Sequence, residues 1–93
     1  MTKIFRTMDY EKEILSIVNQ FKGKLSDEDM DSIVELATHL EWGVALEILC
    51  DQLYEYEIGI NSSTYDKISR LKNMMDVNID LKLLQSLVIQ DGD

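Results

Sequence analysis

The sequence predicts an all-α fold, a compact single-domain bundle of about five short helices spanning residues 1–93. Three observations favour this fold. Apolar residues recur at intervals of three and four along most of the chain, which places them on one face of a helix. Proline is absent, and three of the four isolated glycines stand where a periodic segment begins or ends. A chain of 93 residues is also long enough for one core and too short for two.

The first predicted helix covers residues 7–21, and Gly23 ends it. Its apolar face consists of Tyr10, Ile14, Ile17, Val18 and Phe21. Ser26 is a good N-cap for the second helix, because its hydroxyl can accept a hydrogen bond from a free first-turn amide, where the acids at 27–29 are also favoured. The apolar face of that helix consists of Met30, Ile33, Val34, Ala37 and Leu40.

The third predicted helix, residues 42–56, is the most apolar and is expected at the centre of the bundle. Its apolar face consists of Trp42, Ala45, Leu46, Leu49, Cys50, Leu53 and Tyr56. Strand-like alternation occurs only at residues 54–60, where the end of this helix is the better explanation. The sequence therefore places Tyr56 in the core.

Two further helices complete the predicted bundle. Asn61, Ser62 and Ser63 offer caps for a fourth helix, whose apolar face consists of Tyr65, Ile68, Leu71 and Met75. Asn78 offers a cap for a short fifth helix, whose apolar face consists of Leu81, Leu84, Leu87 and Val88. Because the connections are only a few residues long, neighbouring helices are expected to pack antiparallel around one core.

The charge distribution narrows the possible partners. Eighteen acids against nine bases give a formal net charge of −9. Residues 25–66 contain eleven of the acids and no Lys or Arg, whereas the rest of the chain carries seven acids and nine bases, a net of +2. Direct binding to nucleic acid is disfavoured, because a phosphate backbone must be met by Lys and Arg. A basic protein partner is the better expectation.

Cysteine content and hydropathy indicate where such a protein works. A single cysteine excludes an internal disulfide framework. No apolar run follows Met1 as in a signal peptide, and none approaches the ~20 residues that cross a membrane. We therefore expect a cytoplasmic protein without a membrane partner. The sequence does not indicate the oligomeric state.

The sequence offers no convincing catalytic, metal or cofactor site. The acids of residues 27–31 resemble the start of a calcium loop, but Ser32 and Thr38 stand where that loop needs Gly and a bidentate Glu. His39 and Cys50 are too few for a zinc set or a triad, and fit better as a helix end and a small buried hydrophobe. A Gly-rich phosphate loop is also missing. We expect no enzymatic activity and no cofactor.

The candidate partner-binding residues are on the third helix and just after it. Glu47, Asp51 and Glu55 stand four residues apart, so they line one face, at a cost of roughly 0.2–0.5 kcal/mol per like-charged pair. Tyr54 lies beside this stripe and Glu57 follows it. Charge without local compensation is expected where a basic partner binds, and tyrosine can anchor such a contact. The other interpretation is that the stripe is simply a solvated face.

Residues 41–58, EWGVALEILCDQLYEYEI, resemble the signature of the MafI family of small bacterial immunity proteins. These proteins are found beside polymorphic toxins and contact-dependent growth inhibition systems. The similar segment covers about a fifth of the chain and combines an aromatic-led helix start, an Ala-Leu-Glu and a Leu-Cys-Asp sequence, and an acidic-aromatic end. Relatives often have Pro near the position of Gly59, so the following turn is a point of departure.

The resemblance implies an inhibitor that binds the C-terminal domain of a cognate toxin and blocks its active site. Toxins of such systems are often nucleases, frequently ribonucleases, with basic clefts. On this hypothesis the acidic inhibitor competes with phosphate for the same Lys and Arg side chains. Carried over to this sequence, the candidate partner-binding residues are Glu47, Asp51, Tyr54, Glu55 and Glu57. The alternative is a small acidic helical adaptor or regulator that binds another basic protein.

Overall fold

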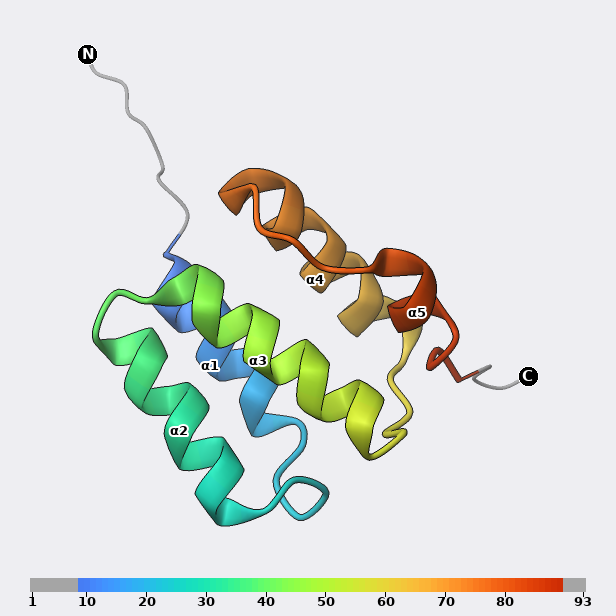
Figure 1. Cartoon of the computed structure of the whole chain (residues 1–93), viewed down its shortest axis with the longest axis horizontal. Coiled ribbons are helices and arrows are strands. Elements are labelled where there is room, and N and C mark those ends of the chain that lie inside the picture. Colours follow the sequence, from blue (N-terminus) through green and yellow to red (C-terminus); the bar gives the residue numbers. More distant parts are fainter. Residues whose placement is uncertain (1–8, 90–93) are drawn as a thin grey trace.

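The computed structural model describes residues 9–89, and these form a helical bundle, which confirms the predicted fold class. The helices are α1 Tyr10–Asn19, α2 Asp27–Thr38, α3 Trp42–Glu55, α4 Ser62–Met75 and α5 Leu81–Gln85. In Figure 1, α3 runs through the middle, with α1 and α2 on one side and α4 and α5 on the other. Among the described residues, none of the helices is long and apolar enough to cross a membrane.

Helix α3 is central, as its composition predicts, and packs against each of the other four helices. Its buried side chains are Ala45, Leu46, Leu49, Cys50 and Leu53. Trp42 is half-buried, with its ring 5.2 Å from that of Tyr10 on α1. The prediction for Tyr56 is wrong, because 57% of this residue is exposed. The helix ends at Glu55, so Tyr56 is the C-cap and leaves the apolar face.

Side-chain caps fix most of the helix starts. Ser26 Oγ accepts from the amide of Asp29 at 3.1 Å, as predicted, and Asn61, one of the three candidate caps for the fourth helix, accepts through Oδ1 from the amide of Thr64 at 2.8 Å. The predicted cap Asn78 is wrong. Asp80 caps α5 instead, because its Oδ1 accepts from the amides of Lys82 and Leu83, the second and third residues of that helix. The last helix is therefore shorter than expected, and Leu87 and Val88 lie beyond it.

Three helices end in a turn that places a non-glycine residue in the left-handed region. These residues are Leu40 after α2, Glu57 after α3 and Asp76 after α4. After α2, the amide of Glu41 donates to Leu36 O at 2.9 Å, and the Leu40 amide donates to Ala37 O at 3.3 Å. This is the hydrogen-bond pattern of a Schellman end, in which glycine is the usual left-handed residue.

The segment after α5 is held against the turn after α3. The Ile60 amide donates to Leu87 O at 2.9 Å, and the Ile89 amide donates to Ile60 O at 2.7 Å, so that Ile60 and Val88 form an isolated parallel bridge. A Cβ on Gly59 would lie 2.6 Å from Ile89 Cγ1, so the absence of a side chain there permits the close approach. The alternation at residues 54–60 thus marks a helix end followed by this bridge.

Candidate protein-binding surface

Helix α3 keeps one stripe of side chains in solvent although it lies at the centre of the bundle. Val44, Asp51 and Glu55 are exposed and Ile48 is half-buried, and at 100° per residue all four lie within a narrow arc of the helix. The opposite side of α3 supplies the buried core residues. Asp51 and Glu55, which form the C-terminal half of this stripe, are therefore available for contact with another molecule.

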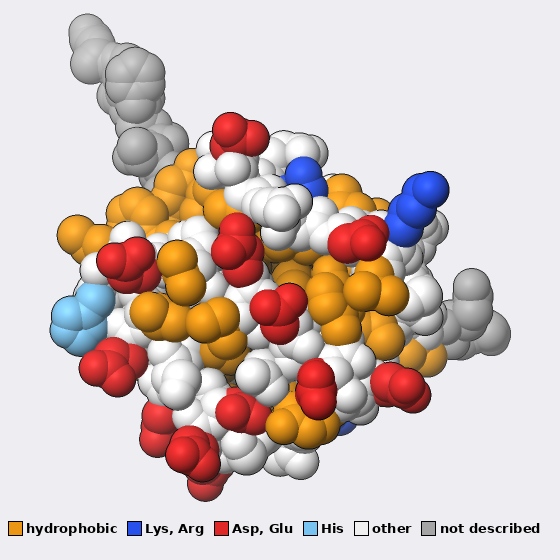
Figure 2. Space-filling view, in the orientation of Figure 1, with side chains coloured by type: hydrophobic (Ala, Val, Ile, Leu, Met, Phe, Trp, Pro, Cys, Tyr) orange, Lys and Arg blue, Asp and Glu red, His pale blue; other side chains and the backbone are white. Residues whose placement is uncertain are grey.

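Acidic side chains dominate the face on which this stripe lies. Figure 2 shows them distributed over α2 and α3, with the blue Lys and Arg side chains mainly at the upper right of the view. The reason is in the sequence, because α2, α3 and their connection fall within residues 25–66, which contain no Lys or Arg. Such a face creates a negative potential that attracts basic proteins over distances up to about a Debye length.

Glu47 and Tyr54 contact the segment before α5 rather than standing free. Glu47 Oε2 accepts from the amide of Asn78 at 3.2 Å, and the Tyr54 hydroxyl donates to the carbonyl of Asp80 at 3.0 Å. Both residues are half-buried. The expectation that the acidic stripe lacks local compensation is therefore wrong at Glu47, whose carboxylate satisfies a backbone donor within the protein.

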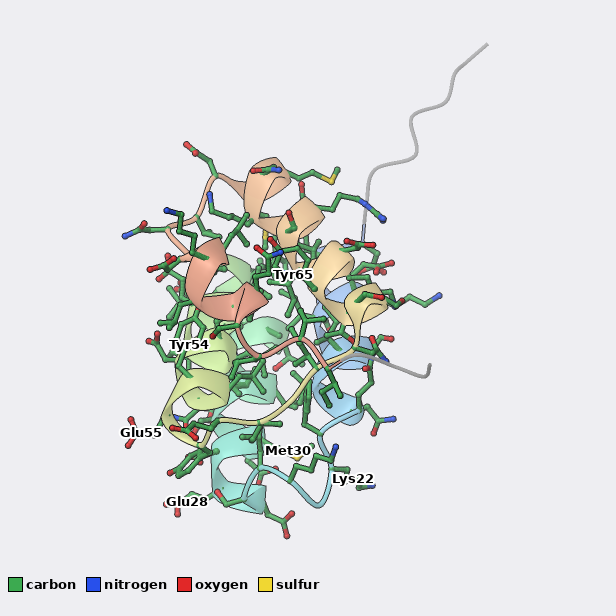
Figure 3. The ribbon with its side chains drawn as sticks, turned by 90° about the vertical axis from the view of Figure 1, so that its right-hand side faces the viewer. Lys22, Glu28, Met30, Tyr54, Glu55 and Tyr65 are labelled. Carbon is green, nitrogen blue, oxygen red and sulfur yellow. The ribbon has the colours of Figure 1, made fainter. Side chains whose placement is uncertain are left out.

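The hydroxyl of Tyr54 lies in a negative environment. Burial is the largest cause that raises its pKa above the ordinary value, and the neighbouring Cys50, Asp80 and Asp51 raise it further. The phenol therefore stays protonated at neutral pH and remains a hydrogen-bond donor. Figure 3 shows Tyr54 on α3 near α5, whereas Glu55 points away from the molecule.

The end of α3 adds two exposed residues to the surface. Tyr56 caps the helix, and Glu57 follows it with a φ of 50°. The turn holds because the Glu57 amide donates to Tyr54 O and the Ile58 amide donates to Leu53 O. Of the five residues predicted to bind a partner, the structure exposes Asp51, Glu55 and Glu57 and gives Glu47 and Tyr54 contacts within the protein.

Two hollows adjoin along Tyr54, which lines both. We call the first, of about 470 Å³, the acidic hollow; it is lined by Glu47, Cys50, Asp51, Tyr54, Asn78, Ile79 and Asp80. We call the second, of about 520 Å³, the apolar hollow; it is lined by Tyr54, Glu57, Gly59, Leu83, Ser86, Leu87, Val88 and Ile89. Local sequence patterns do not indicate Asp80, Leu83 or Ile89 as surface-site residues, because only the fold brings the α5 region beside α3.

Cys50 and His39, the residues weighed from the sequence for metal binding or catalysis, have structural roles. Cys50 is buried, and burial above all raises the pKa of its thiol to about 12, so it is a poor nucleophile at neutral pH. His39 is the C-cap of α2, with Nδ1 2.7 Å from the carbonyl oxygen of Glu35. Across residues 9–89, no group of three or more His, Cys, Asp or Glu side chains is placed to hold a metal ion.

Comparisons with protein-family models, curated proteins and solved structures find no match to this chain.

Proposed function

We propose that this chain is a cytoplasmic immunity protein that binds the C-terminal domain of a cognate bacterial toxin and neutralises it. The toxin domain is a nuclease, in the first instance a ribonuclease, with a basic active-site cleft. The observation that carries the proposal is the exposure of Asp51 and Glu55 in the C-terminal half of the α3 stripe, within a segment of eleven acids and no bases. The resemblance of residues 41–58 to MafI immunity proteins supports it and falls on this same helix.

On this proposal the chain inhibits the toxin by occupying its active-site cleft, and it catalyses no reaction of its own. A nuclease aligns Lys and Arg side chains to hold phosphates, and the carboxylates of Asp51, Glu55 and Glu57 can pair with the same side chains. The acidic face also accelerates encounter with a basic protein, in favourable cases to about 10⁸–10⁹ M⁻¹s⁻¹ at low salt. Inhibition is then stoichiometric and weakens as ionic strength rises.

On this proposal the five candidate partner-binding residues have two different roles. Asp51, Glu55 and Glu57 contact the partner directly, because they are exposed. Glu47 and Tyr54 support the surface, because their hydrogen bonds to Asn78 and Asp80 hold the segment before α5 against α3. Reversing the charge of Glu47 would disturb that contact, so it is a poor choice for testing recognition.

The experiment that tests the function is affinity capture of the tagged protein from a lysate of its own organism, first at low and then at high salt. We expect a basic toxin domain, retained in roughly 1:1 ratio and released by salt. The recovered domain is then assayed on RNA with increasing amounts of the inhibitor. Activity should fall linearly and reach zero near one equivalent.

The adaptor hypothesis gives a different result in the same experiment. A small adaptor would retain an unrelated basic protein, and adding it to that protein would not rescue cells from any toxin. Recovery of the tagged chain alone, or of a housekeeping complex, therefore contradicts the immunity proposal. Production of the captured toxin domain in cells, with and without this chain, decides between the two.

A further inference from the structure

We propose that the adjoining acidic and apolar hollows bind one segment of a protein partner, a segment that carries a Lys or Arg next to a large apolar side chain. The identity of the partner rests on the proposed function, whereas the geometry of the two hollows does not depend on that function. The partner segment must present a cation to the acidic hollow and an apolar side chain to the apolar hollow. The two side chains must be close together, because the hollows adjoin on either side of Tyr54.

The acidic hollow provides carboxylates from two separate parts of the chain. Asp51 comes from α3, and Asp80 comes from the start of α5. Asp80 uses Oδ1 to accept two backbone amides at 3.1 Å, which holds its side chain in position while a carboxylate still has further lone pairs to offer. Tyr54 donates to the Asp80 carbonyl and so fixes this side of the hollow. A Lys or Arg side chain placed between Asp51 and Asp80 would have two anionic neighbours.

The apolar hollow provides hydrophobic surface that the bundle leaves uncovered. Leu83 is 46% exposed and Ile89 is also exposed, whereas Leu87 and Val88, which line the same hollow, are half-buried. Figure 2 shows hydrophobic side chains gathered near α5 beside acids of the α3 side. An apolar patch with a charged rim is a common form of protein-binding site, because burial gives affinity and the rim gives orientation.

The charge of the hollows indicates which kind of segment binds in them. A second copy of this chain would bring another net charge of −9 to an acidic surface. The four residues that follow Ile89 in the sequence, QDGD, carry two carboxylates and no cation. A cationic segment of a partner protein has the complementary charge, and the adjoining apolar hollow adds the requirement for a hydrophobic side chain. Residues 1–8 of this chain also carry cations beside apolar residues (Lys3, Ile4, Phe5 and Arg6), and their occupation of the hollows would block peptide selection and so overturn the proposal.

The test is selection from a library of short random peptides displayed on phage, panned against the whole protein. We expect the selected peptides to share a Lys or Arg within four residues of Leu, Ile, Phe, Met or Trp. Synthetic copies should bind Leu83→Gln and Asp51→Asn at least tenfold more weakly than the unaltered protein. Both substitutions lie on exposed helix positions, so circular dichroism should show an unchanged fold.

Two matched controls separate the hollows from the surface at large. Met74→Gln removes an apolar side chain that is 49% exposed on α4, close to the exposure of Leu83. Asp31→Asn removes one exposed carboxylate from α2, as Asp51→Asn removes one from α3. Peptide affinity should change less than twofold in either control.

Several results would overturn the proposal. These are selected peptides without a basic residue, no selected peptide at all, equal losses in Leu83→Gln and Met74→Gln, or a dimer that Leu83→Gln dissociates. The proposal of binding in the hollows can also be tested separately from the immunity function. If Leu83→Gln still protects cells from the toxin but loss of the α3 acids does not, the proposal of segment binding in the hollows is wrong and the immunity function stands. Peptide binding at the hollows without protection would overturn the immunity function alone.

Discussion

Replacing Leu40 by glycine should make this protein more stable, although it deletes a large apolar side chain. Leu40 stands after α2 with a φ of 67°, the left-handed region that ordinary residues avoid because Cβ crowds the following carbonyl oxygen. The turn itself is well bonded, since the amides of Leu40 and Glu41 donate to carbonyls of the last turn of α2. Glycine preserves these bonds and removes the crowding.

The expected size of the effect follows from three contributions. Relief of the left-handed conformation is worth about 1–2 kcal/mol. Greater freedom of glycine in the unfolded chain costs about 0.5–1 kcal/mol. Lost burial is small, because 69% of Leu40 is already exposed. The mid-range values give a net gain of about 0.75 kcal/mol in the free energy of unfolding, which raises Tm by about 3–6 °C for a domain of this size.

Urea and thermal unfolding of Leu40→Gly and Leu40→Ala measure this directly. Alanine keeps Cβ and therefore the crowding, so its free energy of unfolding should stay within about 0.5 kcal/mol of the unaltered protein or fall slightly. The reasoning is refuted if Leu40→Gly unfolds at lower urea concentration than the unaltered protein. It is also refuted if alanine stabilises as much as glycine, because the gain would then come from removing the side chain and not from the backbone.

Three other predictions follow from the caps, the α3 contacts and the buried thiol. Ser26→Ala should lower the free energy of unfolding in urea by about 1 kcal/mol, because the Asp29 amide loses its acceptor; no change would exclude the cap as a stabilising contact. Glu47→Ala should also cost about 1 kcal/mol through loss of the Asn78 contact, while the exposed Asp51→Ala stays within about 0.5 kcal/mol; equal costs would contradict the division of roles. Burial raises the pKa of Cys50 to about 12, so Ellman's reagent at about pH 8 should react with the folded protein only as fast as it opens; immediate reaction would contradict a buried protonated thiol.

The same thiol gives the sign of a pH effect at alkaline pH. The pKa of Cys50 rises from 9.0 to about 12 on folding. Its contribution to stability is therefore fully present below about pH 9 and is lost as the pH rises toward 12, because the unfolded chain releases this proton first. Cys50→Ala should make the unfolding midpoint less sensitive to pH in that range.

The helices could be predicted from local sequence because their signals are local. Ser26 caps α2 as expected, and Asn61, one of three candidates, caps α4, since a cap needs only a side chain and an amide three residues on. The apolar spacing of α3 likewise predicts its central position. Asn78 and Asp80 are two residues apart and have equally good capping chemistry, so the sequence does not decide between them.

The surface could be predicted only in part, because it depends on where α3 ends and on what lies beside it. Tyr56 fits the period of α3, but a left-handed turn at Glu57 ends the helix without a glycine to signal it. Glu47 looks uncompensated from the sequence, because its partner, the Asn78 amide, is 31 residues away. The apolar hollow is formed by segments from α3, the turn at Gly59 and the α5 region, so no local pattern indicates it.

The most direct test of the central claim is protection of cells that produce the captured toxin domain. Asp51→Lys with Glu55→Lys reverses the α3 acids, and Asp31→Lys with Asp66→Lys gives the same change in net charge on α2 and α4, all at exposed positions. We predict that the α3 pair abolishes protection and that the control pair keeps it, with both variants folded by circular dichroism. Full protection by the α3 pair would contradict recognition through this surface, and failure of the unaltered protein to protect would contradict the immunity function itself.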